Sequence, residues 1–79
     1  MKMEVLDIIL NSIEKVKNFT DYANRINCDI DVIQGRYTVD AKSIMGVFSL
    51  NLVEPVSVRI ISDDDIMVKN FLYKMEEFR

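Results

Sequence analysis

The chain has 79 residues, 49% hydrophobic and 29% charged, which suits one small folded domain, 1–79, and leaves no room for a second. Its formal net charge of −3 argues against a nucleic-acid backbone as the main partner. No stretch reaches the ~18 apolar residues of a membrane span, and the mixed, acidic first ten residues do not resemble a signal peptide, so we expect a cytoplasmic protein.

The N-terminal third predicts a strand followed by a helix. Apolar residues alternate weakly over 3–10, which is typical of a strand. Asn11 and Ser12 are residue types of turns and helix N-caps, and the stretch 13–26 that follows them is amphipathic. The apolar stripe of this predicted helix consists of Ile13, Val16, Phe19, Ala23 and Ile26.

A hairpin is predicted next. The stretches 29–34 and 37–40 have the pattern of strands, and only Gly35 and Arg36 separate them. Glycine at the first central position of a two-residue loop favours a type II′ turn.

A short helix and a further strand follow the hairpin. Ser43 is a good N-cap for a helix over 44–50, and Glu54-Pro55 then breaks the chain before an alternating strand at 56–61. Within the short helix, Val47 and Leu50 are the better core candidates.

The last predicted helix spans 63–78. Ser62 and Asp65 have the spacing of a capping box, and three successive acids suit the positive end of a helix dipole. The acidic run Asp63-Asp64-Asp65 could also suggest a metal site, but it lacks the alternating oxygen ligands of a calcium loop, so we expect no metal.

The order strand-helix-strand-strand-helix-strand-helix indicates an α+β two-layer sandwich. The single cysteine, Cys28, excludes an internal disulfide and is expected to be a buried or half-buried apolar residue. The adjacent Asp29 should raise the pKa of its thiol rather than activate it.

The run Asp40-Ala41-Lys42-Ser43-Ile44-Met45-Gly46-Val47 resembles the segment around the regulatory serine of HPr, the phosphocarrier protein of the bacterial sugar phosphotransferase system. The similarity extends over 26–60, and more weakly, by element order, to the rest of the chain. It implies an open-faced sandwich in which three helices cover one side of a four-stranded antiparallel sheet.

The family's phosphocarrier site is degenerate here. The resemblance places Ser12 at the position of the phosphate-accepting histidine, Glu14 at that of an arginine and Lys15 at that of a proline, and the chain has no histidine at all. A neutral imidazole makes the phosphoryl group transferable, and a serine without a neighbouring base does not replace it. We therefore expect neither carrier activity nor catalysis, and no cofactor.

Two features of the resemblance remain for function. Ser43 corresponds to a serine that a dedicated kinase phosphorylates, although the N-cap role alone would also favour serine. Ile44, Met45 and Phe48 correspond to an apolar patch that docks onto partners, although the same residues could instead cover the sheet.

The resemblance leaves two functions open. One is a regulator similar to the catabolite-repression variant of HPr, with an HPr kinase-like enzyme or a transcriptional regulator as partner. The other is an interaction module of HPr fold that is not phosphorylated. Glu14, in place of the arginine, is expected to repel a phosphate on Ser43.

Overall fold

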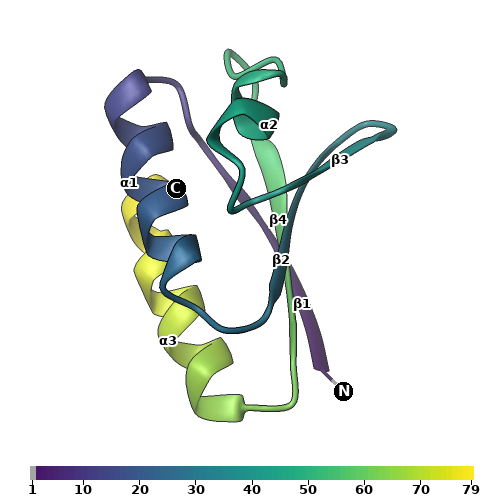
Figure 1. The fold of residues 1–79 in the computed structure, drawn as a ribbon, viewed down its shortest axis with the longest axis vertical. Helices are drawn as coiled ribbons and strands as arrows, with labels where there is room; N and C mark the ends of the chain where they lie inside the picture. Colours follow the sequence, from purple (N-terminus) through teal and green to yellow (C-terminus); the bar gives the residue numbers. More distant parts are fainter. Residues whose placement is uncertain (1) are drawn as a thin grey trace.

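The computed structural model describes the backbone of residues 2–79 and the side chains of 3–79. Four antiparallel strands form one sheet in the order β1-β4-β2-β3. Figure 1 shows α1 and α3 lying side by side along one face of this sheet, with α2 on the same side, beside the upper end of α1. This is the α+β open-faced sandwich that the sequence predicts.

The elements alternate along the chain as expected. Their bounds are β1 (Lys2–Ile8), α1 (Ile13–Asn24), β2 (Asp29–Gln34), β3 (Tyr37–Asp40), α2 (Ile44–Phe48), β4 (Val56–Ser62), α3 (Asp65–Met75) and a 3-10 helix, η1 (Glu76–Phe78).

Strand β1 is shorter than the prediction of 3–10. Its ladder with β4 ends at the pair Ile8–Val56, and the next amide, that of Ile9, donates to the carbonyl of Phe78 at 2.6 Å. Leu10 is fully buried although it lies outside the strand. The apolar run therefore extends beyond the strand because the chain leaves the sheet while still packing on the core.

The first two helices are also two residues shorter than predicted. Beyond α1, the amides of Arg25 and Ile26 each bond a carbonyl three residues back, which tightens the last turn. The amide of Leu50 does the same after α2, at 3.1 Å to Val47. Ile26 and Leu50 are half-buried against the core, so their apolar character reflects packing rather than continued helix.

The capping box predicted for the last helix is wrong. Asp64 is the N-cap, and its Oδ1 accepts hydrogen bonds from the amides of Ile66 at 3.1 Å and Met67 at 3.0 Å. Ser62 Oγ instead accepts from the amide of Asp64 at 3.0 Å. Three adjacent acids offer several possible starts, and this start buries the apolar stripe Val68, Phe71 and Met75.

The hairpin turn is confirmed. Gln34 pairs with Tyr37, which leaves a two-residue loop, and Gly35 has a φ of 60°. No non-glycine residue in the described chain has a positive φ, so the φ of Arg36 is negative. These signs are those of a type II′ turn.

One apolar core lies between the sheet and the helices. Phe19 of α1 meets Phe78 edge to face, with ring centroids 5.9 Å apart, and this contact holds the C-terminal turn against α1. The buried apolar residues are Ile8, Leu10, Val16, Phe19, Ala23, Ile30, Val32, Ala41, Val47, Val56, Val58, Ile60, Val68, Phe71, Met75 and Phe78. Within the described chain, no helix has the length and apolar character needed to cross a membrane.

Candidate functional site

The start of α2 is held by a compact set of hydrogen bonds. Ser43 is the N-cap, and its Oγ accepts from the amide of Gly46 at 3.1 Å. Just before it, the Asp40 carboxylate accepts from the amide of Lys42 at 2.9 Å, and the Asp40 carbonyl accepts from the amide of Ser43 at 3.0 Å. The turn that presents Ser43 is therefore fixed by backbone and carboxylate contacts.

This turn is also tied to the rest of the fold. Ala41 is fully buried, and its amide donates to the carbonyl of Ile30 in β2 at 2.9 Å. From the last turn of α1, the side-chain amide of Asn24 donates to the carbonyl of Lys42 at 3.1 Å. These contacts place the N-terminus of α2 against both β2 and α1.

Gly46 packs closely against the cap of α2. A Cβ at this position would lie 3.2 Å from Ser43 Oγ and 3.4 Å from the Cβ of Val39. The first distance is tighter than ordinary van der Waals contact and involves the capping atom itself. The glycine of the Ser-Ile-Met-Gly run is thus explained by the cap beneath it.

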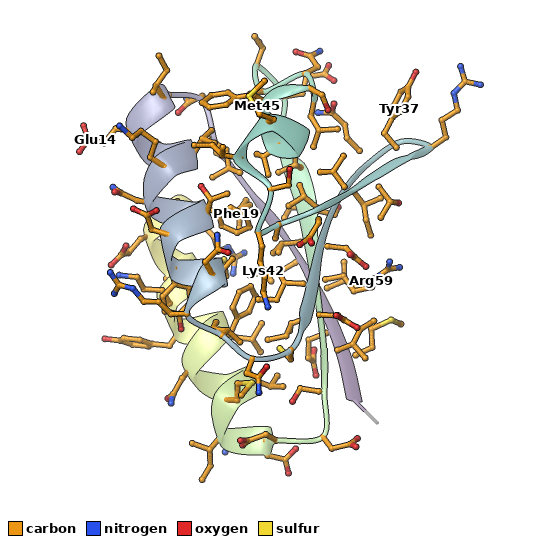
Figure 2. All side chains as sticks on the ribbon, viewed as in Figure 1. Glu14, Phe19, Tyr37, Lys42, Met45 and Arg59 are labelled. Atoms are coloured by element: carbon orange, nitrogen blue, oxygen red, sulfur yellow. The ribbon has the colours of Figure 1, made fainter. Side chains whose placement is uncertain are left out.

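The three predicted partner-binding residues are exposed. Met45 is 76% exposed, and Ile44 and Phe48 are each 38% exposed, whereas Val47 is fully buried. Figure 2 shows Met45 at the outer end of α2, on the side of the helix away from the core. The alternative that these side chains cover the sheet does not hold for Met45 and holds only in part for the other two. We call Ser43, Ile44, Met45 and Phe48 the α2 surface.

Ser12, at the degenerate histidine position, is an ordinary helix cap. It is exposed, and its Oγ accepts from the amide of Lys15 at 3.1 Å. A hollow of about 440 Å³ lies beside it, between the start of α1 and the segment after α2. Its lining consists of Leu10, Asn11, Ser12, Ile13, Phe48, Leu52 and Val53. The fold therefore brings Ser12 and Phe48 of the α2 surface to one hollow.

Glu14 does not share this arrangement. It is exposed, and Figure 2 shows its side chain pointing outward from α1, away from α2. The direction of this side chain gives no support to the repulsion that we expect between Glu14 and a phosphate on Ser43, which stays a prediction.

Sequence reasoning missed two exposed apolar residues at the hollow. The helical spacing predicts Ile13 in the apolar stripe of the first helix, but its side chain is 69% exposed in the first turn of α1. Val53 is 89% exposed in the connection before β4. Val53 lies between Asn51 and Glu54-Pro55, in a segment with no strand or helix pattern. This position is the sequence signal that predicts an exposed side chain.

The acidic run before α3 and Cys28 have structural roles. Among the described residues, no group of three acidic, cysteine or histidine side chains is placed to hold a metal ion, and Asp64 serves as a cap. Cys28 is half-buried, as expected. Burial raises the pKa of its thiol, Asp29 adds to this effect and Lys42 opposes it.

The family model described as "PTS HPr component phosphorylation site" matches residues 15–71, which is more than half of the chain. The chain belongs to the HPr family. HPr proteins are phosphocarriers that interact with other proteins, and they are not enzymes. The matched region includes all of the α2 surface but begins after Ser12 and Glu14.

Solved structures of HPr proteins share the fold. HPr-C-His from Thermoanaerobacter tengcongensis superposes with a TM-score of 0.72 at 24% identity, over 96% of this chain and 92% of that chain. Phosphocarrier protein HPr from Bacillus anthracis str. Ames gives a TM-score of 0.72 at 21% identity, with both chains covered completely. No curated protein sequence matches the chain.

Proposed function

We propose that this HPr-family protein is a non-catalytic regulator that carries no phosphohistidine and acts through the α2 surface. The observation that supports this most is the exposure of Met45 beside an exposed, ordered serine. Burial of Val47 is enough to attach α2 to the core, so packing gives no reason for a large apolar side chain at position 45.

The loss of carrier activity rests on composition and on the surroundings of Ser12. The chain has no histidine. The side chains that line the hollow around Ser12 are apolar apart from Asn11, so none of them supplies a general base. A serine hydroxyl in these surroundings is not activated to accept or pass on a phosphoryl group.

Phosphorylation of Ser43 would change the α2 surface in two ways. It would add roughly −1.5 to −2 charges next to Ile44 and Met45, which weakens docking of apolar or acidic partners and favours basic ones. The phosphate oxygens would also be able to replace Ser43 Oγ as acceptors of the Gly46 amide, so the helix would keep its cap. A modification of this kind alters partner choice without unfolding α2.

The alternative function is an interaction module of HPr fold with no phosphorylation and no link to sugar transport. The structure offers an argument for it, because the cap explains Ser43, burial explains Ala41, and close packing explains Gly46. Lys42, by contrast, makes two hydrogen bonds through its backbone amide and carbonyl, which any residue except proline could supply, so these bonds do not explain a lysine at this position.

The deciding experiment is incubation with an HPr kinase and ATP, followed by intact-mass measurement and peptide mapping. We expect one added phosphate, located on Ser43 and absent from Ser43→Ala. Ser12→Ala is the matched control, because Ser12 is also an exposed N-cap serine whose Oγ accepts an amide at 3.1 Å. An unmodified wild-type chain under conditions that modify HPr would favour the interaction module instead.

A further inference from the structure

No helix in the described part of the chain covers the face of the sheet opposite α1, α2 and α3. Figure 2 shows Arg59 on this side, pointing away from α1 and α3. Strand register and burial place alternate residues of every strand here. We call this set the open face, and it consists of Met3, Val5, Asp7, Asp29, Asp31, Ile33, Thr38, Asp40, Ser57, Arg59 and Ile61.

The open face carries exposed apolar side chains at the β1 edge of the sheet. An antiparallel sheet with one wet face normally carries polar residues there. Here Met3 is 59% and Val5 is 52% exposed, on the edge strand β1. Met3 pairs directly with Ile61, and Val5 with Arg59, so the apolar side chains are contiguous across β1 and β4. Contiguous exposed apolar surface rimmed by polar groups is typical of interaction sites.

An ordered ion pair lies at the centre of this face. Arg59 donates from Nη2 to Asp31 Oδ2 at 2.7 Å across β4 and β2, and both side chains are about 30% exposed. Arg59 Nε is shielded from solvent and has no hydrogen-bond partner. The guanidinium is thus already partly desolvated and held in place, which lowers the ordering cost of burying it further.

The charges of the open face identify the kind of partner. The carboxylates of Asp7, Asp29, Asp31 and Asp40 outnumber the guanidinium of Arg59, which is the one cation among the described side chains of this face. Asp7 and Asp40 are held by hydrogen bonds, from Ser57 Oγ at 2.7 Å and from the amide of Lys42 at 2.9 Å. An acidic rim around an apolar strip repels nucleic acid, anionic lipid and a second copy of the same face.

We propose that the open face docks a protein segment that combines apolar side chains with lysine or arginine. The apolar side chains cover Met3, Val5 and Ile61, and the basic groups pair with the surrounding carboxylates. Helix α2 lies on the helix-covered side of the sheet (Figure 1), opposite the open face, so both surfaces can be occupied at once. This inference is independent of Ser43 and of its phosphorylation.

The test uses the full chain, labelled with 15N, and three synthetic peptides of equal length. One alternates leucine and lysine, one leucine and glutamate, and one serine and lysine. We expect only the leucine/lysine peptide to shift the backbone amides around Met3, Val5, Arg59 and Ile61. Its affinity should fall at least tenfold in Met3→Thr/Val5→Thr, in which threonine preserves strand propensity, and should be unchanged in Tyr73→Ser, which alters the 83% exposed Tyr73 on α3.

Other outcomes overturn the proposal. Equal binding of the serine/lysine peptide would mean that charge alone is recognised. Shifts confined to α1, α2 or α3, or an unchanged affinity in the double variant, would place the contact elsewhere. Concentration-dependent line broadening of β1 and β4 without peptide would make a second copy the occupant.

Discussion

Ser43 and Gly46 are coupled through a single atom. Ser43 Oγ accepts the Gly46 amide at 3.1 Å, and a Cβ on residue 46 would lie 3.2 Å from the same oxygen. The cap that orders α2 therefore also disfavours a side chain at position 46. A larger residue there must shift, by a few tenths of an ångström, the hydroxyl that the proposed phosphorylation uses.

Gly46→Ala should accordingly act through Ser43. In the wild-type background it disturbs the cap, which is worth about 0.5–2 kcal/mol, and this loss opposes the gain of about 1 kcal/mol that alanine brings over glycine in a helix. In a Ser43→Ala background only the gain remains. Urea unfolding should be measured for wild type, Gly46→Ala, Ser43→Ala and the double variant. The free energy of unfolding of the double variant should be higher than the sum of the two single changes gives, and additivity within about 0.5 kcal/mol would contradict this.

Ser43→Asp should preserve stability where Ser43→Ala does not. Aspartate is as good an N-cap as serine, so its carboxylate can accept the Gly46 amide, whereas alanine loses about 1 kcal/mol. Chemical denaturation should therefore rank wild type and Ser43→Asp together and Ser43→Ala below them. If Ser43→Asp is as unstable as Ser43→Ala, the hydroxyl does more than cap the helix.

The fold was predictable because most boundaries carry local signals. The turn at Gly35-Arg36 needs a positive φ at its first residue, and the alternation in β2 and β4 separates the core side from the open face. The errors arose where tertiary contacts decide at which residue a strand or helix ends. The amide of Ile9 bonds to Phe78 near the far end of the chain, and no local pattern around Ile9 reports that contact.

The candidate site was predictable to a smaller extent. Sequence similarity located Ser43, Met45 and the substitution at Ser12, and spacing identified Val47 as the buried residue of α2. Spacing could not show that Ser12 and Phe48, which lie 36 residues apart in the sequence, line one hollow. Nor could it show that Glu14 points away from α2, because the orientation of α1 on the sheet sets that direction.

The chain should accept no phosphate from the phosphoenolpyruvate-dependent enzyme that charges HPr. It has no imidazole, and none of the described side chains that line the hollow around Ser12 is a base. The measurement is incubation with that enzyme and phosphoenolpyruvate, followed by intact mass at neutral pH, with an authentic HPr as the positive control. An acid-labile phosphorylated species of this chain would refute the assignment of a degenerate carrier site.

Cys28 should be a slow nucleophile at neutral pH. Burial is the main cause that raises the pKa of its thiol, while Lys42 lowers this pKa and Asp29 raises it. The rate of alkylation should therefore still be rising above pH 9. Lys42→Met should move the midpoint to higher pH and Asp29→Asn to lower pH. Fast alkylation at pH 7, or shifts in the reverse directions, would show that these groups do not control the thiol.

Met45→Ala should remove partner docking without weakening the fold. Met45 is 76% exposed, so its truncation leaves no cavity, whereas Phe48 is only 38% exposed and its truncation also costs core packing. If Met45 is a hot spot of the interface, its removal weakens binding by about 2 kcal/mol or more, so affinity for a partner should fall more than tenfold. Pull-downs from the source cell with wild type, Met45→Ala and Met45→Ala/Phe48→Ala, each checked for thermal unfolding, measure this loss.

Ile66→Ala is the matched control, since Ile66 is 72% exposed on α3 at a distance from α2 in the chain. Partners retained by the double variant but lost from Ile66→Ala would place the working surface on α3 and make the α2 run a feature of the architecture.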